Sequence, residues 1–336
     1  MKIKLDKSSF NQGLEKLKSE YKILAPKTTP FKGTFSDTDI TKYEEIRTIE
    51  EIEFNKKSNF SAKETILPIT QVLFYFTEKE YKTSDIDDKK LLVFLRACDL
   101  NGVKRIDEIY LRNGIERDYY YERLREKVKF VLIGCKESFR NCFCVSMDSN
   151  KSDNYSMAIN LRDDEIYLDI KDSFLDIFEG EACDFEVDYV KENIINLEVP
   201  ENINPVELSK HPMWDEYDAR CIACGKCNFV CPTCTCFTMQ DIYYKENENV
   251  GERRRVWASC QVDGYTDMAG GHSFRKEKGQ KMRFKTLHKV YDYKKKWGYH
   301  MCVGCGRCDD ICPEYISFST IINKLEDAMN EVKNND

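Results

Sequence analysis

Two cysteine runs with identical spacing are the residues of this sequence best suited to carry chemistry. The first run is Cys221-x2-Cys224-x2-Cys227-x3-Cys231-Pro232, and the second is Cys302-x2-Cys305-x2-Cys308-x3-Cys312-Pro313. The two-residue gaps let a tight loop aim three thiolates at three irons of one cubane, and the x3 step with its proline turns the chain away. The spacing therefore predicts two [4Fe-4S] clusters and electron transfer.

The fourth cysteine of each run is expected to bind the cluster of the other run. By this rule the first cluster takes Cys221, Cys224, Cys227 and Cys312, and the second takes Cys302, Cys305, Cys308 and Cys231. Small residues at Gly225, Gly304 and Gly306 would let the loop backbone approach the cluster. The alternative is a pair of four-thiolate zinc sites, although zinc ribbons usually use paired C-x2-C knuckles.

A third group of cysteines lies earlier in the chain. Cys98 and Cys135 each follow a predicted buried strand, and if these strands are parallel neighbours both thiols emerge at the carboxyl edge of the sheet. With the nearby pair Cys142 and Cys144 they would form a four-thiolate site for a third [4Fe-4S] cluster, with Asp99 as a substitute ligand. The alternative is buried free thiols plus a cysteine pair in a loop.

The remaining cysteines have less informative spacing. Cys234, Cys236 and Cys260 are expected to pack around the clusters as thiols that are not ligands, and Cys183 to be an ordinary core or surface thiol. Between Arg275 and Lys296 the sequence is dense in lysine and arginine. This stretch could bind RNA, dock an anionic redox partner or form a solvated face, and its place between the two runs favours docking.

Composition excludes several classes of protein. Among 336 residues, 52 Lys and Arg stand against 59 Asp and Glu, so the net charge of −7 argues against general nucleic-acid binding. No apolar run approaches the length of a membrane span. The 16 cysteines follow a start without an apolar signal region, so we expect a reducing, cytoplasmic compartment. No G-x-G-x-x-G motif or P-loop is present, so a relay would need partner subunits at both ends, and we expect no catalytic residue in this chain.

Hydrophobic patterns predict an α+β fold with two domains. Buried strands are expected at 91–96 and 129–134, helices at 100–111 and 119–126, a β-hairpin at 156–170, and an N-terminal amphipathic helix with Ser9 as its N-cap. Further helices are expected near 187–197, 206–217 and 316–332. Prolines near residue 200 mark the boundary between an α+β domain, 1–200, and a mainly helical dicluster ferredoxin domain, 201–336.

Several segments together resemble the iron-sulfur electron-transfer subunit of anaerobic sulfite reductase. The resemblance runs from about Leu91 to Tyr315, and a sister family, the iron-sulfur beta subunit of NADP-linked sulfhydrogenases, shares the pattern. The segments that carry it are Arg96-Ala97-Cys98-Asp99-Leu100, Gly134-Cys135, Asn141-Cys142-Phe143-Cys144, Cys231-Pro232-Thr233-Cys234-Thr235-Cys236-Phe237, Ala269-Gly270-Gly271-His272-Ser273-Phe274-Arg275 and Cys302-Val303-Gly304-Cys305-Gly306-Arg307-Cys308.

This resemblance implies a place in a cytoplasmic anaerobic complex. A flavin subunit would oxidise NADH, this chain would relay single electrons, and a sirohaem subunit would reduce sulfite to sulfide. No membrane and no nucleic acid would take part. The alternatives are the sulfhydrogenase beta subunit, distinguished by nickel-iron instead of sirohaem partners, and an iron-sulfur RNA-binding protein, distinguished by salt-sensitive RNA retention.

Overall fold

The chain divides into two compact units, each built from segments that are not contiguous in the sequence. The computed structural model describes residues 1–335, with side chains described through residue 332. The first unit comprises Met1–Leu67, Asp85–Phe139 and Asp148–Asn193, and the second comprises Pro68–Ser84, Arg140–Met147 and Ile194–Asp336. The second unit thus includes two short segments from before residue 200, whereas the sequence analysis expected a single domain boundary near that residue.

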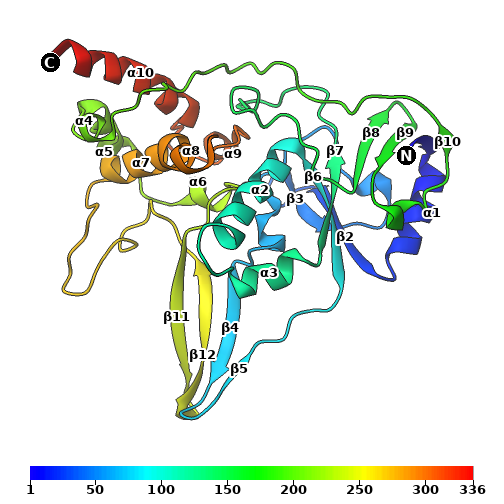
Figure 1. Ribbon diagram of the computed structural model, residues 1–336, viewed down its shortest axis with the longest axis horizontal. Coiled ribbons are helices and arrows are strands. Elements are labelled where there is room, and N and C mark those ends of the chain that lie inside the picture. The colour runs from blue at the N-terminus through cyan, green and yellow to red at the C-terminus, as the bar shows by residue number, and fades with distance from the viewer. Residues whose placement is uncertain (336) are drawn as a thin grey trace. The chain divides into compact units, whose positions relative to one another are not determined.

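The first unit is built on an eight-stranded sheet with the strand order β10-β1-β9-β8-β7-β6-β2-β3 (Figure 1). Strands β2, β6, β7 and β8 run parallel, and the outer strands are antiparallel. The elements of this unit are β1 (Lys2–Asp6), α1 (Lys7–Leu17), β2 (Tyr21–Thr29), β3 (Ile40–Glu45), β6 (Lys90–Arg96), α2 (Ala97–Leu111), α3 (Tyr119–Arg125), β7 (Val128–Ile133), β8 (Met157–Arg162), β9 (Glu165–Ile170) and β10 (Glu181–Ala182).

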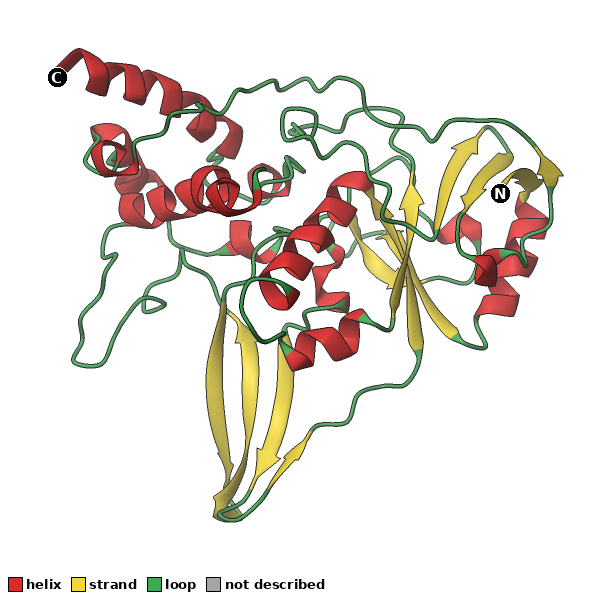
Figure 2. Ribbon diagram, viewed as in Figure 1, coloured by secondary structure: helices red, strands yellow, loops and turns green. Residues whose placement is uncertain are grey.

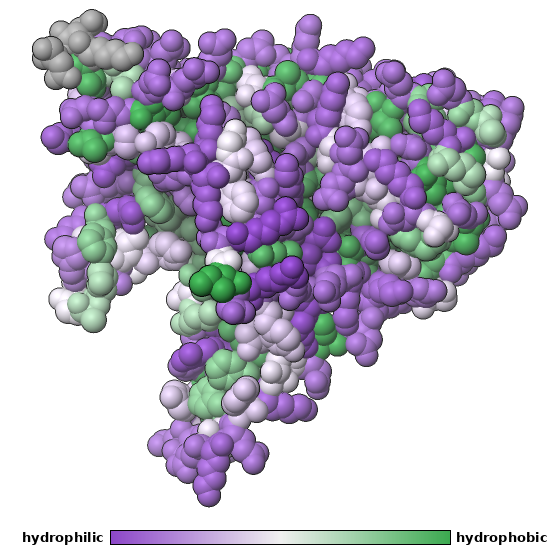
Figure 3. All heavy atoms as spheres, in the orientation of Figure 1, coloured by the Kyte–Doolittle hydropathy of each residue, from purple (hydrophilic) through white to green (hydrophobic). Residues whose placement is uncertain are grey.

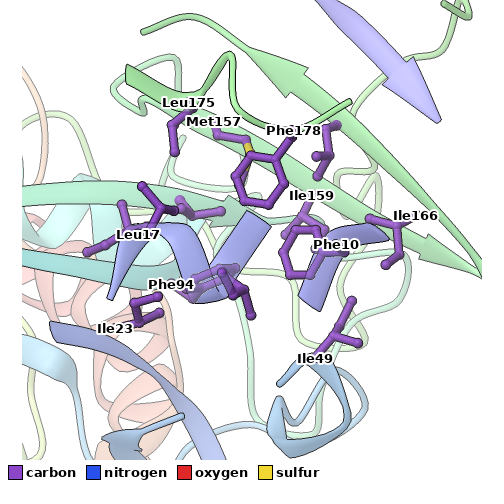
Figure 4. Close-up of a cluster of buried hydrophobic side chains, with 14 of the residues drawn as sticks. Phe10, Leu17, Ile23, Ile49, Phe94, Met157, Ile159, Ile166, Leu175 and Phe178 are labelled. Atoms are coloured by element: carbon purple, nitrogen blue, oxygen red, sulfur yellow. The ribbon is translucent and has the colours of Figure 1, made fainter. Parts of the chain in front are cut away.

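Apolar side chains cover both faces of this sheet. On one face Phe10 and Leu17 of α1 pack with Phe94 and Ile159, and Phe10 stacks on Phe178 with ring centroids 5.1 Å apart (Figure 4). The other face is covered by apolar residues of α2 and α3. The predicted N-terminal helix is confirmed, but Ser9 is not its N-cap: the Asp6 carboxylate accepts the Ser9 backbone N–H at 2.7 Å, so Asp6 caps the helix.

The strand-helix-strand prediction for the middle of the chain is confirmed. β6 and β7 are parallel neighbours, with Leu91 opposite Val128 and Arg96 opposite Ile133. The hairpin prediction is also confirmed, because β8 pairs with β9 in antiparallel register across the turn at Asp163 and Asp164. Continuous apolar runs in β6 and β7 produce these buried strands, as is usual for parallel sheets covered on both faces.

The second unit combines short helices with a four-stranded antiparallel sheet, β11-β12-β4-β5. In Figure 2 these strands form a long ribbon in yellow. The elements of this unit are β4 (Thr70–Phe76), β5 (Tyr81–Thr83), α4 (Pro205–Leu208), α5 (Glu216–Arg220), α6 (Lys226–Phe229), β11 (Phe237–Tyr244), β12 (Asn247–Trp257), α7 (Lys278–Leu287), a π-helical turn (His288–Asp292), α8 (Tyr293–Trp297), α9 (Arg307–Asp310) and α10 (Phe318–Asn335).

Two of the three C-terminal helix predictions need correction. The helix expected at 316–332 is confirmed as α10. The one expected at 206–217 is broken into α4, a 3₁₀ turn at Pro212–Trp214 and α5, because Pro212 has no N–H to continue a helix.

No helix forms at 187–197. There the backbone makes hydrogen bonds with other segments: Cys135 N–H donates to the Asp188 carbonyl at 3.0 Å, and Leu197 N–H donates to Ser146 Oγ at 3.2 Å.

The predicted α+β class is confirmed, with a sheet-rich first unit and short helices around the cysteine runs in the second. The sequence analysis expected a mainly helical second domain, but the second unit also contains the four-stranded sheet, in which β4 from the N-terminal half pairs with β12. Hydrophilic side chains predominate on the face of the molecule drawn in Figure 3. Within the described residues, no helix is both long and apolar enough to span a bilayer.

Candidate iron-sulfur centres

The first cysteine run folds as a tight loop between two short helices. Cys221 follows α5 directly, and Gly225, at φ +73°, is the N-cap residue before α6. Ala223 also has a positive φ, 56°, and its backbone N–H donates to Cys221 Sγ at 3.4 Å. Two left-handed residues in one loop turn the backbone N–H groups inward, which is the arrangement that stabilises bound thiolates.

The second run repeats this geometry position by position. Gly304, at φ +60°, donates its N–H to Cys302 Sγ at 3.4 Å, and Gly306, at φ +69°, is the N-cap residue before α9. Gly304 therefore corresponds to Ala223, and Gly306 to Gly225. The two loops share one backbone conformation, as their common spacing suggested.

Each predicted ligand set lines a cavity of its own in the second unit. The first cavity is lined by Cys221, Cys224, Cys227 and Cys312. The second is lined by Cys302, Cys305, Cys308 and Cys231. Cys227 and Cys308 line both cavities, so the two sites adjoin. The last cysteine of each run thus lies at the cavity of the other run, in support of the interleaved ligand assignment.

The two cavities differ in their access to solvent. Cys224 of the first cavity is exposed, and the neighbouring Ile222 keeps 53% of its surface accessible. Cys302 and Cys305 of the second cavity are buried, together with Val303 and Phe143. The first site therefore reaches the protein surface, whereas the second lies deeper among apolar side chains.

Three buried lysines lie on α7 and the following π-helical turn, and two of them face these cavities. Lys281, Lys285 and Lys289 are only 4 to 5% exposed. Lys285 lines both cavities, and Lys289 lines the second and donates to Thr233 Oγ1 at 2.7 Å. Burial opposes the charge of Lys285, but the thiols of Cys227 and Cys308 raise its pKa above the usual lysine value. Three of the ten basic residues between Arg275 and Lys296 are thus buried, and Lys285 and Lys289 serve the interior instead of the surface expected for this stretch.

The segment Arg140–Met147 packs on the second cysteine loop. Phe143 N–H donates to the Gly304 carbonyl at 2.8 Å, and Asn141 Nδ2 donates to Asp310 at 2.8 Å. A Cβ built on Gly304 would lie 2.4 Å from the Phe143 carbonyl oxygen, so glycine is required for this close approach. The Cys142 thiol donates to the Cys305 carbonyl at 3.4 Å. Spacing could not reveal this contact, because it joins residues more than 160 positions apart.

The four cysteines of the predicted third site belong to different units. Cys98 lies in the first turn of α2 and Cys135 after β7, and both are in the first unit, where Arg96 Nη1 donates to Cys135 Sγ at 3.2 Å. Asp99 accepts a hydrogen bond from Tyr43 at 3.1 Å. Cys142 and Cys144 are buried in the second unit. The third cluster at these residues stays a prediction.

Three cysteines that were expected to be bystanders lie together. Cys234, Cys236 and Cys260 line a third cavity of the second unit, whose wall also includes Lys285 and Lys289. Cys183 is half-buried in the first unit. The close spacing of Cys234 and Cys236 just after the first run is the sequence feature that could have indicated this third cavity.

The donor set fits iron-sulfur clusters. A tetrahedral zinc site needs four ligands around one ion at about 2.3 Å, whereas a cluster takes one thiolate per iron. Among the side chains that the structure describes, residues 1–332, no three His, Cys, Asp or Glu side chains converge closely enough for a single ion. Cysteine-lined cavities, inward N–H groups and buried lysines suit an anionic cluster held by separated thiolates.

Comparisons with known proteins agree with this chemistry. Residues 220–316 match the family described as a 4Fe-4S dicluster domain. The chain is also similar to the beta subunit of sulfhydrogenase 2 of Pyrococcus furiosus, with 27% identity over 307 residues that cover 86% of this chain and 90% of the relative. No solved structure matches the chain. The predicted cofactor type, [4Fe-4S], is confirmed.

Proposed function

We propose that this chain is an iron-sulfur electron-transfer subunit that passes single electrons between two partner subunits of an oxidoreductase. The observation that carries the proposal is the pair of adjoining cavities, which share Cys227, Cys308 and Lys285 and together collect all eight cysteines of the two runs. Clusters of this type accept and release one electron at a time at potentials set by their surroundings.

The residues around the cavities have separate tasks. The eight thiolates hold the clusters, with Cys221, Cys224, Cys227 and Cys312 at the first and Cys302, Cys305, Cys308 and Cys231 at the second. The backbone N–H groups of Ala223 and Gly304 donate to ligand sulfurs. Lys285 supplies positive charge at the wall shared by the two cavities, and Lys289 at the second cavity, which favours the more negative, reduced state of the clusters.

The exposed edge of the first cavity is the docking surface for a partner. Ile222 lies there beside the exposed Cys224. Tyr315, three residues after Cys312, is 86% exposed. Exposed apolar side chains next to a redox centre suit a transient protein contact, because they lose water readily when a partner binds.

Two complexes are consistent with this role. The sequence resemblance supports an anaerobic sulfite reductase, in which an NADH-oxidising flavin subunit donates electrons and a sirohaem subunit reduces sulfite. The similarity to the Pyrococcus furiosus protein supports a sulfhydrogenase about equally well. In either case we place the complex in the cytoplasm, where a reducing environment keeps its 16 cysteines as thiols.

An RNA-binding role has less support. Lys281, Lys285 and Lys289 are three of the ten basic residues between Arg275 and Lys296, and they are buried and unavailable to a phosphate backbone.

The test is purification of the tagged chain from its native host without oxygen, followed by identification of its partners. Co-purified sirohaem with NADH-dependent sulfite reduction supports the sulfite reductase, and co-purified nickel with hydrogen-dependent reduction supports the sulfhydrogenase. The Cys305→Ser variant should lose electron delivery to the terminal subunit but retain dye reduction by the flavin subunit. Full delivery in this variant would reject the relay.

A further inference from the structure

Three cysteines outside the two runs converge on a separate cavity of the second unit. Cys234 and Cys236 follow the first run, and Cys260 follows β12, yet all three line this cavity. Cys234 and Cys260 are buried. The fold therefore brings Cys260 to two thiols, Cys234 and Cys236, that lie 26 and 24 residues earlier in the sequence.

The surroundings of Cys260 are built to hold a thiolate. Asn228 Nδ2 donates to Cys260 Sγ at 3.1 Å, and Gln261 Nε2 donates to the same sulfur at 3.7 Å. Both amides are almost fully buried, and Asn228 belongs to α6 of the first cysteine loop. N–H donors aimed at a sulfur stabilise its ionised form and tune a bound metal centre.

Positive charge faces the same cavity. Lys285, Lys289 and Arg275 are all part of its wall. A buried ammonium group needs an anionic partner to offset its lost hydration. Lys285 lines this cavity as well as the two that hold the cysteine runs, so one cation serves three thiol clusters. An anionic group in the third cavity would complete the pattern seen at the other two.

We propose that Cys234, Cys236 and Cys260 hold a third iron-sulfur cluster, next to the two clusters of the cysteine runs. This inference rests on the proposed electron-transfer function. Three thiolates bind three irons of a [4Fe-4S] core and leave one iron to a ligand other than cysteine. Tyr265 lines the same cavity as the three cysteines, so it is placed to supply an oxygen ligand.

This location competes with the N-terminal one predicted from the sequence. Cys234, Cys236 and Cys260 lie in one unit and share one cavity, whereas Cys98 and Cys135 lie in the first unit and Cys142 and Cys144 in the second. The proposed cluster is thus held by cysteines that the sequence analysis expected not to be ligands.

The test counts iron and sulfide in the full chain purified without oxygen. We expect about twelve irons per chain, four for each cluster. Cys260→Ser and the double variant Cys234→Ser/Cys236→Ser should each lose about a third of the iron, yet keep the EPR signals of the two clusters in the cysteine runs. Cys183→Ser is the matched control and should lose none. Mössbauer spectra of the wild-type chain, which need no variant to fold, should show one iron with non-sulfur coordination.

Several results would overturn the proposal. Wild-type protein with about eight irons, zinc bound at the three cysteines, or full iron in Cys260→Ser with loss in Cys98→Ser would each do so. Failure of the electron-transfer function itself looks different: the chain would then contain no iron and sulfide at all. A chain with about eight irons and intact relay activity would reject only the third cluster.

Discussion

The backbone of Phe143 is hydrogen-bonded to the backbone of Gly304, with 2.8 Å between the Phe143 nitrogen and the Gly304 oxygen. This contact ties a segment from the N-terminal half of the chain to the loop that presents Cys302 and Cys305. Gly304 occupies the same place in its loop as Ala223 does in the first loop, and both residues have a positive φ. The first loop tolerates a Cβ at this place, whereas the second does not, because Phe143 lies against it.

Gly304→Ala should therefore destabilise the second unit. The added Cβ would lie 2.4 Å from the Phe143 carbonyl oxygen, so the segment at 140–147 must move. Strain at positive φ and overpacking together should lower the free energy of unfolding by about 2–4 kcal/mol. Loss of cluster absorbance in a denaturant titration measures this change. Ala223→Gly is the matched control and should be neutral or slightly stabilising, and equal stability of both variants would contradict the packing argument.

Removing the charge of Lys285 should lower the reduction potentials of the clusters. Its ammonium group faces both cavities, and positive charge stabilises the reduced, more negative state. At an effective dielectric constant near 20, Lys285→Met should shift the potentials downward by about 50–100 mV. Redox titration followed by EPR measures the shift. Lys295→Met, an exposed lysine of α8, serves as the control, and unchanged potentials in both variants would remove Lys285 from this role.

Sequence patterns correctly predicted the elements whose structure is determined by residues close together in the sequence. The apolar runs in 91–96 and 129–134 became adjacent buried strands, and equal spacing in the two cysteine runs became two loops of one conformation. Ligand spacing is informative because the loop between the cysteines is too short to adopt many shapes. Continuous apolar strands are informative because parallel sheets bury both faces.

Contacts between residues far apart in the sequence could not be predicted in this way. No periodicity links Phe143 to Gly304, or β4 to β12. The positions of Lys281, Lys285 and Lys289 follow an i, i+4 repeat, which could have indicated one helix face. Lysine is nevertheless almost never fully buried unless it is paired, so the sequence favoured a surface role. The thiols of the folded unit explain the burial of Lys285 and Lys289, whereas the buried Lys281 forms an ion pair with the Asp263 carboxylate.

The interleaved ligand assignment predicts that a cysteine variant in the first run will alter the EPR signal of the cluster bound by the second run. Cys231 belongs to the first run but lines the cavity of the second, together with Cys302. Cys231→Ser should therefore alter the same EPR signal as Cys302→Ser, and leave the signal altered by Cys221→Ser intact. Oxygen is a weaker ligand for iron than a thiolate, so the affected cluster should lose iron or shift its potential. If Cys231→Ser instead matches Cys221→Ser, each run binds its own cluster.

A charge placed at Ile222 should slow electron exchange with a partner but leave the clusters unchanged. Ile222 lies beside the exposed Cys224 and is itself 53% exposed, so an aspartate there stays solvated and need not perturb folding. Docking of a partner would have to bury that charge, and we expect at least a ten-fold lower rate, which corresponds to about 1.4 kcal/mol. Stopped-flow reduction by the flavin subunit measures the rate. Ile194→Asp is the control, because Ile194 is 82% exposed and lines neither cysteine cavity, and it should react like the wild type. Equal rates for the Ile222 and Ile194 variants would place the docking surface elsewhere.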